Sequence, residues 1–82
     1  MTLEKIEIGE SAIITAILNN EFTLKLIEMG FYENKMVQLI ARTFDKETVS
    51  VKIGHSKIML RKDEAQTVIV RKCSGIEELK GQ

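Results

Sequence analysis

The chain has 82 residues, with 12 basic and 12 acidic side chains, one His, one Cys and no Pro or Trp, so its formal net charge is zero. A chain of this length builds one domain around a small core, which excludes enzyme folds that need a large sheet or a deep cleft. The single cysteine, Cys73, excludes a disulfide framework and a Cys-rich zinc module.

The sequence predicts neither a membrane span nor a signal peptide. The longest apolar runs are three residues, such as Ala12-Ile13-Ile14, far below the roughly 20 residues of a transmembrane helix. The N-terminus has no basic segment followed by an apolar one. We therefore expect a cytoplasmic protein that does not insert into a membrane.

The first elements along the chain are a strand and a short helix. Residues 11–18 are predicted to form a strand. Phe22, Leu26 and Met29 then recur at helical spacing, and Gly30 is suited to the left-handed position that ends a helix. A helix of about two turns is marginal alone, so we expect it to be held by packing against a sheet.

Alternating apolar and polar residues predict strands for most of the remaining chain. Val49, Val51 and Ile53 fall on one face of a predicted strand over residues 48–53. Gly54-His55 fits a two-residue type II′ turn after it. The other predicted strands cover residues 37–42, 56–60 and 67–71, and residues 63–66 are predicted to form a single turn between the last two.

The predicted fold is mostly β: a small barrel of about five antiparallel strands, with one short helix after the first strand. We expect the barrel domain to cover residues 1–73. We expect residues 74–82 to be a short C-terminal tail, in which the capping-box spacing of Ser74 and Glu77 predicts a short or frayed helix.

Set on this frame, several segments resemble the ferrous iron transport protein A (FeoA) family. They are Leu26-Ile27-Glu28-Met29-Gly30-Phe31 and Leu60-Arg61-Lys62-Asp63-Glu64-Ala65, with Val49-Ser50-Val51-Lys52-Ile53-Gly54 between them. The resemblance covers about residues 3–71. Two positions depart from the family pattern: Glu33-Asn34 stands where Pro-Gly is usual, and Lys25 stands where Arg is frequent. Asn34 can take a positive φ, so the turn can survive.

The resemblance implies an SH3-like barrel without catalysis of its own. It also implies a partner: the cytosolic part of FeoB, the membrane permease that carries a GTPase domain. The same domain occurs as a module of iron-dependent repressors, so a repressor-type or nucleic-acid-binding barrel is the alternative. The interrupted basic residues, the zero net charge and the missing helix-turn-helix argue against that alternative.

The predicted helix and its exit are candidates for partner binding. Because a short helix directs one stripe at the core, Leu24, Ile27 and Phe31 cannot all be buried on the face that holds Leu26. Apolar groups left over would form a docking patch together with Lys25 and Tyr32. The competing interpretation is that the barrel wraps the helix and buries both stripes.

A second candidate is a basic rim. Lys57 and Arg61 are the positions that we expect to contact a partner, and Lys62, Arg71 and Lys72 are predicted to gather near them around the last two strands. Such a rim suits an acidic partner surface. The ordinary interpretation is a solvated strand face.

No cofactor, metal site or catalytic centre is predicted. His55 and Cys73 are the weak candidates for metal ligands, but a site needs three or more converging ligands. They also lack the third group and the pocket of a nucleophilic centre, and no phosphate-binding loop motif is present. Nucleic acid is not an expected partner, and weak self-association is left open.

Overall fold

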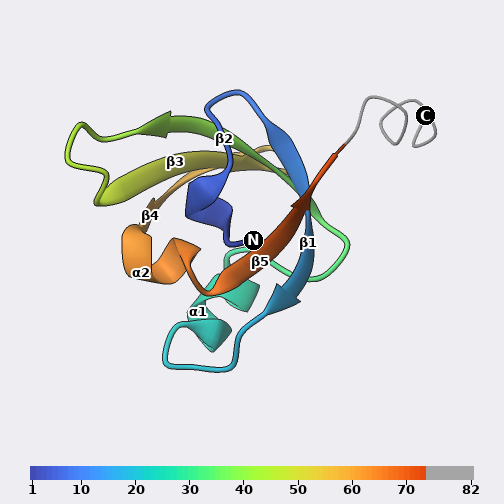
Figure 1. Ribbon diagram of the computed structural model, residues 1–82. Coiled ribbons are helices and arrows are strands. Elements are labelled where there is room, and N and C mark those ends of the chain that lie inside the picture. The colour runs from blue at the N-terminus through green and yellow to red at the C-terminus, as the bar shows by residue number, and fades with distance from the viewer. Residues whose placement is uncertain (74–82) are drawn as a thin grey trace.

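The computed structural model describes residues 1–73, so the predicted tail helix lies outside the described residues. The chain forms a curled antiparallel sheet with short helical segments at its ends (Figure 1). The elements are a 3-10 helix η1 (Leu3–Lys5), β1 (Ser11–Ile17), α1 (Thr23–Glu28), β2 (Met36–Arg42), β3 (Thr48–Ile53), β4 (Ser56–Arg61), α2 (Lys62–Ala65) and β5 (Val68–Lys72).

The five strands form one sheet in the order β4-β3-β2-β1-β5, and every pairing is antiparallel. The sequence prediction of five antiparallel strands with one short helix after the first is therefore confirmed. Register shifts interrupt the pairing between Ile14 and Ala16 on β1 and between Leu39 and Ala41 on β2. Such bulges bend strands and increase their twist, which lets a short sheet curl into a barrel.

The apolar side chains of the alternating segments fill the inside of this barrel. Val49, Val51 and Ile53 of β3 are all buried, as the pattern predicts. The core also receives side chains from every other element, including Leu3, Ile14, Val37, Leu39, Leu60, Ala65, Val68 and Val70. Gly54 has a φ of 59°, which suits the predicted tight turn between β3 and β4.

Helix α1 ends in a Schellman motif. Gly30 has a φ of 102° and donates its N–H to the carbonyl of Ile27 at 3.0 Å, while the Phe31 N–H bonds the carbonyl of Leu26 at 2.9 Å. This motif brings the residue after the glycine against the last inward-facing helical residue. Leu26 and Phe31 are both fully buried as a result. Asn34 has a φ of 72°, as expected for a residue that replaces the usual glycine.

Two local features differ from the prediction. The 3-10 helix η1 was not predicted, and the turn expected over residues 63–66 is a four-residue helix, α2, at Lys62–Ala65. Among residues 1–73, no helix is long and apolar enough to cross a membrane.

Candidate docking surface

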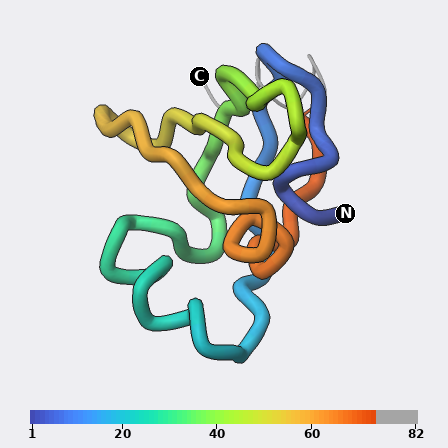
Figure 2. Tube along the Cα trace, turned by 90° about the vertical axis from the view of Figure 1, so that its left-hand side faces the viewer, coloured from blue at the N-terminus to red at the C-terminus, as the bar shows by residue number. Residues whose placement is uncertain are grey.

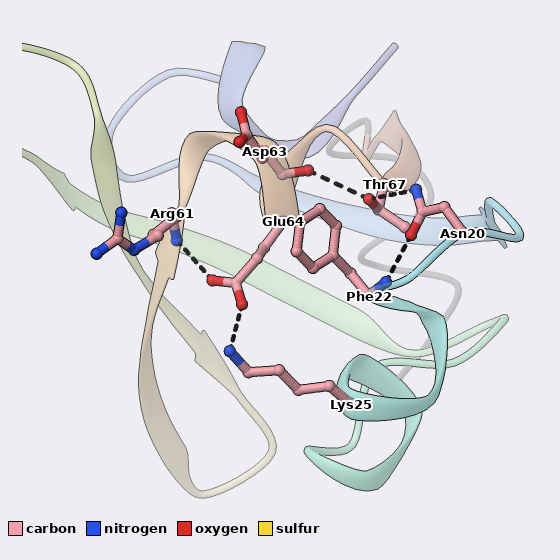
Figure 3. Close-up of polar contacts among 7 residues, drawn as sticks. All are labelled: Asn20, Phe22, Lys25, Arg61, Asp63, Glu64 and Thr67. Atoms are coloured by element: carbon pink, nitrogen blue, oxygen red, sulfur yellow. Dashed lines mark hydrogen bonds and ion pairs between the residues drawn. The ribbon is translucent and has the colours of Figure 1, made fainter.

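Helix α1 is fixed to the rest of the domain through a buried carboxylate. Lys25 on α1 forms an ion pair with Glu64 on α2, although the two residues are 39 positions apart (Figure 3). The other carboxylate oxygen of Glu64 accepts the Arg61 backbone N–H at 2.9 Å. The Glu64 side chain is only 7% exposed, whereas that of Lys25 is 58% exposed. Lys25 therefore helps to hold α1 in place through this ion pair, while much of its side chain remains exposed.

This environment sets the charge of Glu64. Burial alone would raise the pKa of its carboxyl group, but the Lys25 ammonium and the Arg61 N–H outweigh burial and hold that pKa below its ordinary value. Glu64 therefore remains a carboxylate at neutral pH. Lys25 meets this carboxylate through its side chain, whereas Arg61 meets it through its backbone N–H and its side chain extends away (Figure 3).

A second group of hydrogen bonds fixes the start of the helix. Asn20 donates through Nδ2 to Oγ1 of Thr67 at 3.0 Å, and Thr67 donates its hydroxyl to the carbonyl of Asp63 at 3.2 Å. Asn20 also accepts the Phe22 N–H on its Oδ1 at 2.8 Å (Figure 3). The segment just before α1 and Lys25 within α1 are thus both tied to the segment that contains α2. Figure 2 shows the teal segment with α1 at one end of the molecule, beside the orange segment.

On α1 and in the loop that follows it, three large apolar residues remain exposed. Leu24 is 69% exposed, Ile27 47% and Tyr32 49%. We call these three residues the helix patch. Ile27 and Tyr32 line one hollow of about 420 Å³ together with Ile17, Thr23 and Glu33. Lys35 lies 5.4 Å from the centre of the Tyr32 ring and so holds the ring by a cation–π contact.

The structure corrects the sequence analysis at Phe31, which was expected in the docking patch. Its side chain is fully buried, because the Schellman motif after Gly30 turns it under the helix against Leu26. The one-stripe argument treated residue 31 as helical, whereas the helix ends at Glu28. The structure therefore leaves Leu24, Ile27 and Tyr32 on the surface and assigns Phe31 to the core.

The sequence analysis missed Ile17. It lies at the end of β1, is half-buried, and lines the same hollow as Ile27 and Tyr32. The bulge between Ile14 and Ala16 changes the register of β1 just before this residue. A prediction from strict alternation cannot detect such a shift in register. The only trace of it in the sequence is the run of three apolar residues at positions 16–18, which breaks the alternation.

The basic rim is only partly assembled. Lys57 and Arg61 lie on the exposed face of β4, on either side of Met59, and Lys62 follows in α2. Arg71 and Lys72 lie on β5, at the opposite end of the strand order, and Lys72 approaches Glu10 at 3.5 Å. The expected gathering of all five around the last two strands is thus wrong, because β4 and β5 are not neighbours in the sheet.

The two weak metal candidates lie in separate places. His55 is exposed in the turn between β3 and β4, and Cys73 is half-buried after β5. Within residues 1–73, no three His, Cys, Asp or Glu side chains are grouped so that they could hold a metal ion.

The geometry of this domain agrees with its similarity to known proteins. The chain is 34% identical over 71 residues to an Fe(2+) transport protein A of Campylobacter jejuni, which covers 85% of this chain and 96% of that protein. The structure superposes with a TM-score of 0.78 on the FeoA of Stenotrophomonas maltophilia, solved with zinc and described as a procaryotic SH3 domain protein. That pair is 28% identical and covers 87% of this chain and 89% of the other.

The iron(II) transport protein A of Clostridium thermocellum gives a TM-score of 0.82 at 29% identity. That match covers 88% of this chain and 45% of the longer Clostridium chain. The family model of the FeoA domain matches residues 1–72 of this chain. The five-stranded SH3-like barrel and this match, which covers most of the chain, lead to one conclusion: the protein belongs to the FeoA domain family.

Proposed function

We propose that this protein is a non-enzymatic accessory protein of ferrous iron uptake that docks on the cytosolic GTPase part of a FeoB permease through the helix patch. Membership in the FeoA family and the name of the Campylobacter relative support the role in iron transport. The observation that carries the docking surface is that Leu24 and Ile27 on α1, and Tyr32 just after it, remain exposed while Lys25 ties α1 to Glu64.

The fixed helix favours binding because little order has to be gained on association. Lys25, Asn20 and Thr67 hold α1 against the barrel before any partner arrives. Full burial of a Leu or Ile side chain contributes about 1.5–3 kcal/mol, and ordering costs in the partner offset part of that gain. Tyr32 adds an aromatic ring of the kind that is frequent among residues with large effects on binding.

The basic residues beside the patch support a partner with acidic groups. Lys25 lies on α1 itself, and Arg61 and Lys57 lie on the exposed face of β4. Charges at the rim of an interface mainly speed association and select the partner, and their effect falls with salt. We assign Lys25, Arg61 and Lys57 this steering role, with the helix patch supplying most of the affinity.

The structure offers no support for the repressor alternative. The two α-helices within residues 1–73 have six and four residues. A helix-turn-helix reader places a recognition helix in the major groove, and neither of these helices is long enough for that arrangement.

The test is a titration of this protein into the purified cytosolic domain of the FeoB from the same genome, with and without guanine nucleotide and ferrous iron under anaerobic conditions. We expect saturable binding that Leu24→Glu weakens by about tenfold or more, because a charge would replace a buried contact. The control is Ile8→Glu, since Ile8 is also exposed, at 58%, but lies in the loop before β1. Equal weakening by both variants, or no binding in any nucleotide state, would contradict the proposal.

A further inference from the structure

We propose that a cationic hollow on a different face of the domain binds a small soluble anion of the polyphosphate class. The hollow has a volume of about 350 Å³ and is lined by Glu4, Lys5, Arg42, Lys46, Lys62 and Gln66. We call it the cationic hollow. None of its residues belongs to the helix patch, so the inference does not rest on the proposed function.

Three distant segments of the chain build this hollow. Glu4 and Lys5 come from η1, Lys46 from the turn between β2 and β3, and Lys62 from α2. The Lys62 N–H donates to the carbonyl of Glu47 at 2.8 Å, which ties α2 to that turn. Helix α2 also contacts η1, and Figures 1 and 2 both show the blue N-terminal segment beside the orange helix.

Arg42 is held in the wall of the hollow. Its Nη2 donates to the carbonyl oxygens of Glu4 at 2.7 Å and Ile6 at 2.9 Å. The bulge between Leu39 and Ala41 precedes it on β2. A guanidinium has five N–H donors, and these two bonds use only one of its three nitrogens. The other N–H groups of Arg42 make no hydrogen bond to residues 1–73, so an anion in the hollow could accept from them.

The lining of the hollow carries more positive than negative side chains. Within residues 1–73, Lys5, Lys46 and Lys62 make no ion pair, whereas Lys25 and Lys72 each have a carboxylate partner. With Arg42, the hollow has four cationic side chains and a single carboxylate, that of Glu4. Like charges gathered in a recess repel one another, and a bound anion removes that repulsion.

Glu4 supplies a second, independent observation. Its Oε1 accepts the Thr2 hydroxyl, but its Oε2 is buried without a hydrogen-bond partner. A buried oxygen in this state is costly unless a donor reaches it. Because this oxygen is covered, the Glu4 side chain would have to rotate on binding, so that a hydroxyl of the ligand meets Glu4 while its acidic oxygens meet the lysines. A phosphate group is suited to this role, because its second pKa of about 6 leaves it partly protonated near neutral pH.

Size and shape favour a small molecule over a polymer. A volume of about 350 Å³ lies at the lower end of small-molecule pockets, which run from about 300 to 1,000 Å³. The cations converge on one recess, whereas a nucleic-acid surface presents a groove that follows the backbone and carries stacking aromatics. Inorganic triphosphate is a small polyanion whose negative charges are opposite to those of the lining lysines and arginine, so we choose it as the probe.

The experiment is calorimetric titration of inorganic triphosphate into the full-length protein near physiological salt. Three proteins are titrated: the wild type, the double variant Lys46→Gln/Lys62→Gln, and the matched control Lys52→Gln/Lys57→Gln. The control removes the same two charges from the exposed face of β3 and β4. Glutamine removes the charge but keeps an unbranched polar side chain, so it brings no new branching at Lys46, where the backbone has a φ of 64°.

We expect single-site binding that the hollow variant weakens by about tenfold or more, since lysine–phosphate contacts are charge-assisted. The control should stay within about twofold of the wild type, because its lysines lie outside the recess and act only through screened long-range charge. Amide shifts in an NMR titration should concentrate at Lys5, Lys46 and Lys62. Equal weakening in both variants, no saturable binding by the wild type, or shifts centred elsewhere would overturn the proposal.

Discussion

Helix α1 and strand β4 each present a prominent apolar side chain to solvent, yet their surroundings differ. Leu24 on α1 is 69% exposed and Met59 on β4 is 68% exposed. Leu24 belongs to a patch with Ile27 and Tyr32, whereas Met59 stands between Lys57 and Arg61. Single exposed apolar residues are normal on protein surfaces, and contiguous groups are the ones that mark interaction sites. The neighbours of a residue, more than its exposure, therefore distinguish the two regions.

A similar contrast exists within α1 itself. Leu24 and Leu26 are two positions apart, but Leu26 is fully buried against the barrel. Replacing Leu26 with Ala should lower the free energy of unfolding by about 2–5 kcal/mol, because a core leucine leaves a cavity. Chemical denaturation measures this loss. Leu24→Ala is the paired control, and we expect it to change stability by less than about 0.5 kcal/mol.

The turn that directs Phe31 into the core depends on Gly30. Gly30→Ala should destabilise the domain by about 1–2 kcal/mol, because an L side chain is strained at a φ of 102°. An added Cβ would meet no atom within 4 Å, so the cost comes from the backbone and not from a clash. Thermal unfolding measures it, and Gly30→Asn should lose less than Gly30→Ala because Asn tolerates positive φ. If all three proteins melt together, the Schellman motif does not hold Phe31 in place.

Lys25 tests the link between the helix and α2. Lys25→Met should cost about 1 kcal/mol at pH 7, since half of this ion pair is exposed and screened. The folded pKa of Glu64 lies below its ordinary value of 4.5. The stability that the pair contributes is therefore present above that ordinary value and is lost as the pH falls through the folded pKa.

Urea unfolding of both proteins between pH 7 and pH 3 measures this effect. The gap between the wild type and Lys25→Met should close toward the acid end of that range. A gap that stays constant with pH would mean that the variant loses packing of the lysine stem and not the pairing with Glu64.

Much of the fold could be predicted because its strands alternate. The predicted strand over residues 48–53 matches β3 at both ends, and Val49, Val51 and Ile53 are buried as expected. The other strands end within one residue of the predicted limits. Gly30 and Asn34 could also be assigned, since positive φ restricts residue choice.

What the sequence could not predict depends on contacts between distant residues. The pairing of Lys25 with Glu64 and the cationic hollow both join segments far apart in the chain. The bulge before Ala41 had no local signal either. Phe31 is different: Gly30 followed by a large apolar residue is itself the mark of a Schellman motif, so its burial could have been predicted.

The most direct test of the helix patch compares two matched truncations, Leu24→Ala and Met59→Ala, in binding to the cytosolic domain of FeoB, the proposed partner. Both remove an apolar side chain of similar exposure without changing charge. We predict that Leu24→Ala weakens binding by at least about fivefold, as expected for a residue central to an interface. Met59→Ala should bind as the wild type does. A larger loss for Met59→Ala, with Leu24→Ala unchanged, would contradict the assignment and place the docking surface on β4.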